Sequence, residues 1–141
     1  MSQLEQSILE SINLKKKLIT HENEINKSIK TKYKSIKKGG KVFLCGNGGS
    51  AADAQHLAAE FVVRYKLERG PLASMALTTD TSILTAHSND YHFDTVFERQ
   101  VQALCKPEDL VICLTTSGTS NNINLALEAA NKLGAFTVAL T

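Results

Sequence analysis

The chain has 141 residues, of which 43% are hydrophobic and 21% charged, and its formal net charge at pH 7 is +2. These values are ordinary for a globular protein and indicate one domain with enough apolar side chains for a core. No apolar run approaches the roughly 20 residues of a membrane-spanning helix, and the amino terminus lacks the basic-then-apolar layout of a signal peptide. We therefore expect a cytoplasmic protein with no membrane partner.

The charge is unevenly distributed. Residues 1–41 carry ten Lys and four Glu, whereas the remainder has a net negative charge. Tyr33 is the only aromatic residue of the basic segment, which has no DNA-reading motif, so we expect solvated helix faces and no nucleic-acid partner.

The three cysteines, Cys45, Cys105 and Cys113, lack the spacing of metal ligands. Because Cys45 and Cys113 lie in apolar strand-like runs, we expect buried free thiols.

Two amphipathic helices are predicted at the amino terminus. Leu4, Ile8 and Ile12 recur at helical spacing and predict a helix over 3–19. A second helix has the pattern Ile25, Ile29, Tyr33 and Ile36 and ends at Lys37-Lys38-Gly39-Gly40, where basic residues and glycine are stop signals. The two apolar stripes exceed what one layer of a sheet needs, so we expect them to pair with another subunit.

From Lys41 onward, short apolar strands alternate with helices. This alternation predicts an α/β fold with a three-layer open parallel sheet, flavodoxin-like or Rossmann-like, preceded by the N-terminal helix pair. We expect a single domain over 1–141, with helices over 1–38 and an α/β core over 41–141. The expected strands are Val42–Cys45, Leu72–Leu77, Leu110–Leu114 and Phe136–Leu140, and the expected helices are Ser50–Arg64, 81–88, Phe93–Leu104 and Asn121–Leu133. We expect Thr78-Thr79-Asp80 to cap the helix over 81–88 and Ser88-Asn89-Asp90 to break it.

Two polar turns follow predicted strands and precede predicted helices, so they belong to the same edge of the sheet. Gly46-Asn47-Gly48-Gly49-Ser50 departs from the dinucleotide fingerprint, because Ala51 replaces its last glycine and no acidic residue follows at the expected distance. The second turn, Thr115-Thr116-Ser117-Gly118-Thr119-Ser120, offers five hydroxyl groups and no basic side chain. Hydroxyls and free amides at a helix start suit a phosphate monoester.

The helix after the first turn carries a polar stripe of Asp53, His56, Glu60 and Arg64. His56 and Glu60 are spaced to offer two ligands to a divalent metal, or Glu60 to act as a proton shuttle. An exposed ladder in which Glu60 pairs with Arg64 explains the same spacing, and the sequence does not decide between them. We interpret the other three histidines, His21, His87 and His92, as surface or helix-end residues.

Taken together, these motifs resemble a known family. Gly-Asn-Gly-Gly-Ser, Asp-Ala-Gln-His with Ala-Glu beyond it, Leu-Thr-Thr-Asp-Thr-Ser, Asn-Asp-Tyr and Thr-Ser-Gly-x-Ser are similar to the bacterial phosphoheptose isomerases. These enzymes belong to the larger group of sugar isomerase (SIS) domains. The resemblance implies interconversion of D-sedoheptulose 7-phosphate and D-glycero-D-manno-heptose 7-phosphate for lipopolysaccharide or other surface polysaccharides. It also implies a homotetramer with active sites between subunits, and in many members a zinc ion.

The resemblance also implies a role for individual residues. His56 and Glu60 would be metal ligands, with Glu60 also the catalytic base, and Arg64 would orient a carboxylate or hydroxyl. The implied sugar contacts are Asn47, Gly48, Gly49, Ser50, Asn89 and Asp90, and the implied phosphate contacts are Thr115, Thr116, Ser117 and Ser120. Thr115 stands where the family commonly has Ser. Relative to the family the chain is incomplete at its carboxyl end, which lacks the helix whose Gln and His complete the metal site, and two ligands hold zinc poorly.

A second interpretation stays open. A non-catalytic SIS domain that senses a phosphosugar, or that binds a partner such as a replication initiator, would share the turns and depend more on the helix pair. Glu60 discriminates between the two, because a pure binding module does not need a carboxylate at that position.

Overall fold

The computed structural model describes all 141 residues, which form two compact units, Met1–Thr31 and Lys32–Thr141. The first unit consists of α1 (Gln3–Lys17), a 3₁₀ turn η1 (Leu18–His21) and the start of α2 (Glu22–Lys37). Ser2 caps α1, because its Oγ accepts the Glu5 amide at 3.1 Å and the Glu5 carboxylate reaches back to the Ser2 amide. Both predicted helices are present, although the first ends in the 3₁₀ turn and the second begins earlier than its apolar repeat.

The apolar side chains of α1 and η1 lie largely in solvent. No residue of α1 is buried. The exposed fraction of these side chains ranges from 41% to 72% for Leu4, Ile8, Leu9, Ile12, Leu14, Leu18 and Ile19. Exposed aliphatic side chains in this number on one short segment favour association with another surface.

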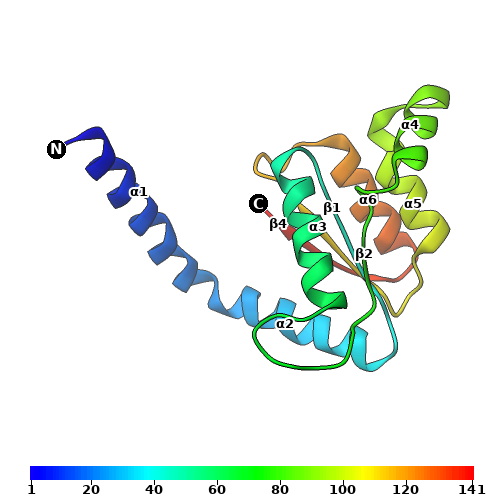
Figure 1. Ribbon diagram of the computed structural model, residues 1–141, viewed down its shortest axis with the longest axis horizontal. Coiled ribbons are helices and arrows are strands. Elements are labelled where there is room, and N and C mark those ends of the chain that lie inside the picture. Colours follow the sequence, from blue (N-terminus) through cyan, green and yellow to red (C-terminus); the bar gives the residue numbers. More distant parts are fainter. The chain divides into compact units, whose positions relative to one another are not determined.

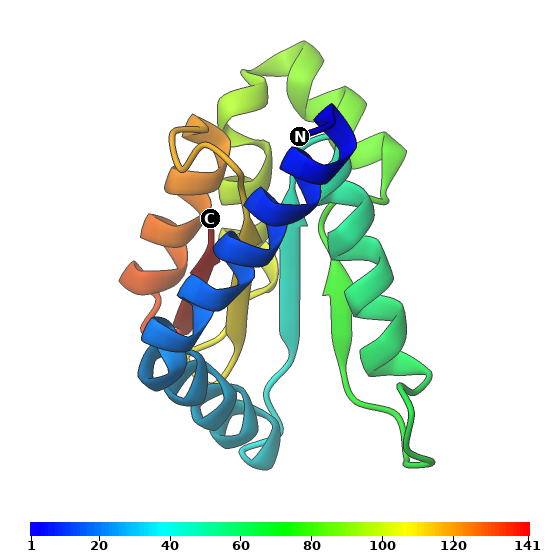
Figure 2. The same ribbon diagram turned by 90° about the vertical axis from the view of Figure 1, so that its left-hand side faces the viewer.

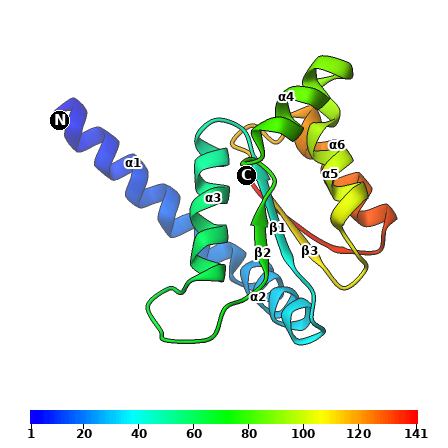
Figure 3. The ribbon, with the colours of Figure 1, turned by 45° about the vertical axis from the view of Figure 1, so that its right-hand side comes forward.

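The second unit is built on a four-stranded parallel sheet in the order β2-β1-β3-β4. The strands are β1 (Val42–Gly46), β2 (Ser74–Ala76), β3 (Leu110–Leu114) and β4 (Phe136–Leu140). Figures 2 and 3 show the strands running in the same direction. Strand β1 lies at the centre and is buried along its whole length, as its unbroken apolar run predicts.

Helices cover both faces of this sheet. Phe43, Cys45, Val111 and Cys113 point to the face covered by α5 (Val96–Leu104) and α6 (Asn121–Lys132), with α4 (Thr81–Asp90) beside them. The alternate residues of β1 and β3 point to the opposite face, where α3 (Gly49–Val62) and the end of α2 pack. Figure 1 shows α3 on one side of the strands and α5 and α6 on the other. The predicted three-layer α/β fold is confirmed.

Several element boundaries differ from those predicted, among them β2, which spans Ser74–Ala76 instead of Leu72–Leu77, and the ends of α3 and α4. Ser88-Asn89-Asp90 does not break a helix, because α4 continues to Asp90 and Tyr91 still bonds to the His87 carbonyl. Its start is as predicted, since the Asp80 carboxylate caps α4 by accepting the Ile83 amide at 2.9 Å. Helix α3 ends at Val62, so Arg64 lies beyond it. None of the helices is long and apolar enough to cross a membrane.

The strand order creates a switch point between β1 and β3. From β1 the chain turns to β2 on one side, and it then crosses to β3 and β4 on the other side. In open parallel sheets ligands bind beyond the carboxyl ends of the strands at such a point, where the connecting segments diverge to opposite faces. The two polar turns singled out in the sequence are the segments that follow β1 and β3.

Candidate functional site

The turns after β1 and β3 enclose a small cavity of about 70 Å³. Its polar lining comes from both turns, which are separated by more than 60 residues along the chain. The lining residues are Asn47, Ser50, Leu114, Thr115, Thr116, Ser117 and Ser120. The prediction that these turns lie at one edge of the sheet and converge is therefore confirmed.

The first turn depends on two glycines. A Cβ atom at Gly46 would lie 2.6 Å from the Ser50 carbonyl oxygen, so only glycine lets the end of β1 approach the first turn of α3 this closely. Gly48 has φ of +55°, in the left-handed region, and occupies the N-cap position of α3. No side chain caps this helix, so its amino end retains the partial positive charge that attracts anions.

In the second turn, the hydroxyl oxygens of Thr115 and Ser117 accept hydrogen bonds, which leaves the protons of these two groups free. Thr115 Oγ1 accepts the Gly118 amide at 3.2 Å. Ser117 Oγ accepts the Thr119 amide and hydroxyl at 3.2 and 3.1 Å. A hydroxyl used as an acceptor can still donate its O–H, and Ser120 begins α6 without a side-chain cap. The turn thus presents O–H donors and a helix amino end, a combination suited to phosphate oxygens.

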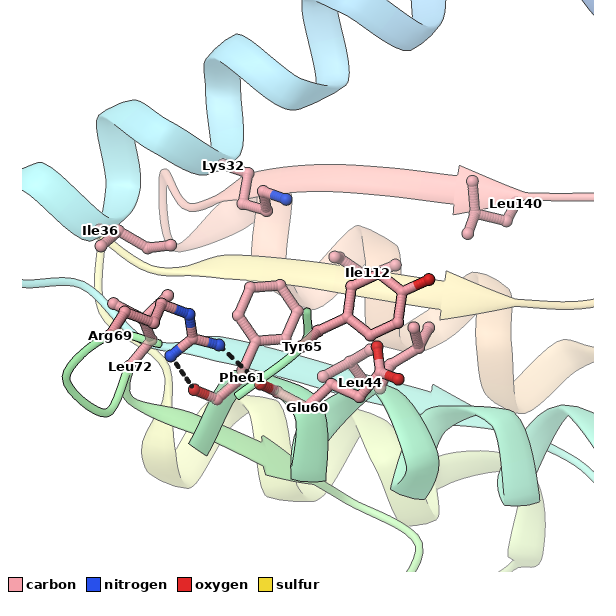
Figure 4. A pocket seen from close by; sticks show the side chains of 11 residues that line it. Lys32, Ile36, Leu44, Glu60, Phe61, Tyr65, Arg69, Leu72, Ile112 and Leu140 are labelled. Carbon is pink, nitrogen blue, oxygen red and sulfur yellow. Dashed lines mark hydrogen bonds between the residues drawn. The ribbon is translucent and has the colours of Figure 1, made fainter. Parts of the chain in front are cut away.

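His56 and Glu60 contact each other on α3, with 3.0 Å between Nε2 and Oε1. The His56 side chain is 72% exposed and the Glu60 side chain 28%. Glu60 lines a different and larger cavity, of about 400 Å³, between α3 and the sheet. Figure 4 shows Glu60, Phe61 and Tyr65 on one side of this cavity, with Ile112 and Leu140 on the other. Glu60 and the two turns do not share a cavity within one chain.

Arg69 is a functional candidate that the sequence patterns missed. Its guanidinium donates to the backbone carbonyls of Glu60 at 2.6 Å and Phe61 at 2.9 Å, as the dashed lines of Figure 4 show. These carbonyls belong to the last turn of α3 and have no partner within the helix. Arg69 therefore fixes the backbone that carries Glu60. The only available signal was a basic side chain a few residues beyond a predicted helix.

Arg64 occupies a different environment from the one predicted. Its guanidinium lies 3.4 Å from Glu68, both side chains are largely exposed, and it does not line either cavity. The ladder between Glu60 and Arg64 considered from the sequence is not formed, because the helix ends between them.

The remaining sugar-contact candidates lie outside the small cavity. Asn89 and Asp90 are exposed in the last turn of α4, where the Asn89 amide donates to the Asp90 carboxylate at 2.9 Å. Gly48 lines a neighbouring cavity of about 120 Å³, and Gly49 begins α3 without lining either. One chain thus brings together Asn47, Ser50 and the second turn, and leaves Asn89 and Asp90 separate.

The residues of one chain do not by themselves form a zinc site. His56 and Glu60 supply one imidazole and one carboxylate, and no group of three or more His, Cys, Asp or Glu side chains is arranged to hold a metal. Catalytic zinc takes three protein ligands. The donor types are those zinc accepts, but one chain supplies two of the three.

His87 and the cysteines are buried. His87, predicted to be a surface or helix-end residue, lies in the last turn of α4 but is buried, since it bonds to the Thr95 hydroxyl at 2.8 Å and stacks on Tyr91. The predicted burial of free Cys45 and Cys113 is confirmed, with their sulfurs 3.2 Å apart on neighbouring strands. This contact, together with burial, raises the pKa of the Cys45 thiol well above its ordinary value.

Comparison with known proteins gives a consistent result. The family model of the SIS domain matches residues 8–141. The phosphoheptose isomerase of Aquifex aeolicus is 63% identical over 107 residues, which cover 76% of this chain and 56% of that protein. The phosphoheptose isomerase of Solidesulfovibrio magneticus is 55% identical over 120 residues, which cover 85% and 59%. The chain therefore spans just over half the length of these curated relatives.

Solved structures give the same result. Phosphoheptose isomerase GmhA from Neisseria gonorrhoeae has a TM-score of 0.88 and 40% identity, with 97% of this chain and 72% of that chain covered. The enzyme from Francisella tularensis has a TM-score of 0.86 and 37% identity, with 100% and 76% covered. These relatives are all isomerases, so the non-catalytic interpretation is not favoured. The chain belongs to the SIS domain family and, within it, to the phosphoheptose isomerases.

Proposed function

We propose that this chain binds sedoheptulose 7-phosphate and takes part in its isomerisation to D-glycero-D-manno-heptose 7-phosphate. The observation that carries the proposal is the small cavity between the turns after β1 and β3, lined by hydroxyl groups. Two uncapped helix starts adjoin these turns, and no basic side chain lines the cavity. Neutral donors and helix dipoles together suit one phosphate monoester.

The chemistry requires a base close to the reacting carbons. A ketose becomes an aldose when a proton leaves C1, an enediol forms, and a proton returns to C2 while the oxygens exchange theirs. Glu60 is the carboxylate we assign to this transfer. It is partly shielded from solvent, it lines a cavity, and Arg69 fixes its backbone.

We further propose that the active site is shared between subunits of a homotetramer. Ser50 and Glu60 are ten residues apart on α3, so they are separated by about 15 Å along the helix. An extended seven-carbon chain with its phosphate spans only about 10 Å, taking the reach of an extended backbone as a guide. Glu60 then acts on a sugar whose phosphate is held by another copy. The exposed aliphatic surface of α1 and η1 supports self-association.

A zinc ion belongs to the same proposal. His56 and Glu60 would supply two ligands, and a third would have to come from elsewhere in the assembly, because one chain brings only these two together. When bound, the metal would polarise the sugar carbonyl.

A cytoplasmic location and a role in heptose supply for lipopolysaccharide complete the proposal. The three free thiols support the location.

The test is an assay of aldose formation from sedoheptulose 7-phosphate, with and without added zinc. The chain is assayed after fusion at Thr141 to the corresponding carboxyl-terminal part of the Aquifex aeolicus enzyme. We expect turnover, and we expect Glu60→Gln to lower it by about 10²–10⁴-fold, the usual contribution of a positioned base. Glu128→Gln, at an exposed site on α6, is the matched control and should leave the rate unchanged. Equal rates for the two variants would remove Glu60 from the mechanism.

Mixing variants tests the shared site. Glu60→Gln and Ser117→Ala should each be slow alone, and co-refolded mixtures should regain activity, because some sites then combine an intact Glu60 with an intact phosphate turn. No gain on mixing contradicts a site shared between copies.

A further inference from the structure

Asn122 is a buried polar residue that no sequence motif singled out. It is the second residue of α6 and is 3% exposed. Its carboxamide faces that of Asn47 in the first turn, and the two exchange a pair of hydrogen bonds. Asn47 Nδ2 donates to Asn122 Oδ1 at 2.9 Å, and Asn122 Nδ2 donates to Asn47 Oδ1 at 2.8 Å. Burying an amide costs free energy unless it is paired, so the two side chains hold each other in place.

This amide pair joins the two halves of the candidate site. Asn47 lies between β1 and α3, and Asn122 lies just after the hydroxyl-rich turn, 75 residues further along the chain. Asn47 lines both the small cavity and the neighbouring cavity of about 120 Å³. Asn122 lines neither cavity, and both hydrogen bonds of its side chain are with Asn47.

We propose that Asn122 is a positioning residue for phosphosugar binding, which fixes the orientation of the Asn47 carboxamide and the separation of the two turns. This inference rests on the proposed function. Because one oxygen and one N–H of Asn47 are committed to Asn122, the remaining N–H and lone pair of Asn47 are held in a set direction. A cavity of about 70 Å³ leaves little room for the turns to move apart without losing contacts to a phosphate.

The substitution Asn122→Asp tests the pair with almost no change in shape. At neutral pH the introduced carboxylate can accept from Asn47 Nδ2, but its second oxygen faces Asn47 Oδ1, and two acceptors then oppose each other. When the carboxyl is protonated, its O–H can donate to Asn47 Oδ1 and both hydrogen bonds return. The defect should therefore disappear as the pH falls towards about 4, near the ordinary pKa of an aspartate.

The measurement is the dissociation constant of the 141-residue chain for sedoheptulose 7-phosphate, by calorimetry, across this pH range and well below the thermal midpoint of each variant. The matched control is Asn124→Asp on the exposed side of α6. At neutral pH we expect roughly tenfold weaker binding for Asn122→Asp, from one lost hydrogen bond and one repulsive contact. The ratio of its dissociation constant to that of the unsubstituted chain should approach one at low pH. Asn124→Asp should keep a ratio near one throughout.

The outcomes are distinct. A ratio near one for Asn122→Asp at neutral pH, or a raised ratio that does not change with pH, overturns the inference and leaves the proposed function intact. If the unsubstituted chain does not bind the sugar phosphate, the proposed function fails and the inference fails with it. Should Asn122→Asp not fold, Asn122→Ala removes the pair without adding a charge, and it must weaken binding relative to Asn124→Ala for the inference to stand.

Discussion

The two ends of the parallel sheet differ in how their polar groups are satisfied. At the amino end, Asp109 is fully buried, and its carboxylate accepts the backbone amides of Lys41 at 2.7 Å and Lys106 at 2.8 Å, with the Lys41 ammonium 3.1 Å away. Nearby, the Ser35 hydroxyl donates to the Glu108 carbonyl at 2.8 Å. Polar groups here find their partners within the chain.

At the carboxyl end the arrangement is the reverse. Hydroxyl groups of the second turn keep free O–H donors, and α3 and α6 begin without side-chain caps. Polar groups that are hydrogen-bonded within the chain contribute to stability, whereas donors that stay unpaired and accessible are available to a ligand. The two ends of the sheet therefore have separate roles, and substitutions at each end should change different quantities.

The largest effect on stability is expected at the amino end. Asp109→Ala removes a buried carboxylate and leaves two amides and an ammonium group without their acceptor, so the free energy of unfolding should fall by about 3 kcal/mol or more. Asp53→Ala, at an exposed position of α3, is the control and should stay within about 0.5 kcal/mol. Urea unfolding measures both, and an equal effect of the two would contradict a structural role for the amino end.

At the carboxyl end we expect a smaller effect, which concerns ligand binding and not stability. Ser117→Ala removes one O–H donor from the cavity, so sugar phosphate binding should weaken by about tenfold, the value of a hydrogen bond to a charged group. Its free energy of unfolding should change little, because the Ser117 side chain is exposed. Ser82→Ala, in the exposed first turn of α4, should change neither quantity. If the Ser117→Ala chain binds the sugar phosphate normally but has a lower free energy of unfolding, the carboxyl end serves stability and not binding.

The smallest effect concerns alkaline pH and again belongs to the amino end. Burial, followed by the nearby charge of Asp109, raises the pKa of Cys105 from 9.0 to about 11. The folded chain therefore keeps a proton that the unfolded chain loses above pH 9, and stability should decline between about pH 9 and 11. The Cys105→Ala chain should lose about 1–2 kcal/mol less than the unsubstituted chain over this interval. If the free energy of unfolding falls by the same amount between pH 9 and pH 11 in the two chains, Cys105 makes no such contribution.

Much of the fold could be predicted from local patterns. The apolar runs Leu110–Leu114 and Phe136–Leu140 are strands with the predicted bounds, because a strand buried on both faces has a continuous hydrophobic signature. Helix ends were harder to predict. Asn89 and Asp90 have poor intrinsic helix propensity, but α4 continues through them, and α3 stops before Arg64 although nothing in the local sequence requires it.

The candidate site was predictable where it depends on chain order and not where it depends on tertiary pairing. Strand–turn–helix order was enough to bring the two turns together. The pair of Asn47 and Asn122 spans 75 residues, and the contacts of Asp109 with Lys41 span 68, so neither has a local signal. The separation of Glu60 from the turns follows from helix rise, which motif matching does not consider.

In the function we propose, the turns after β1 and β3 together hold one phosphorylated sugar. The most direct measurement is a titration of the isotopically labelled chain with sedoheptulose 7-phosphate, followed through backbone amide chemical shifts. We expect the amides of Gly46–Ser50 and Thr115–Ser120 to shift with a single dissociation constant, while those of Lys41, Lys106 and Asp109 stay in place. Shifts confined to one turn, or larger shifts at the amino end of the sheet, would show that the two turns do not bind the sugar phosphate together.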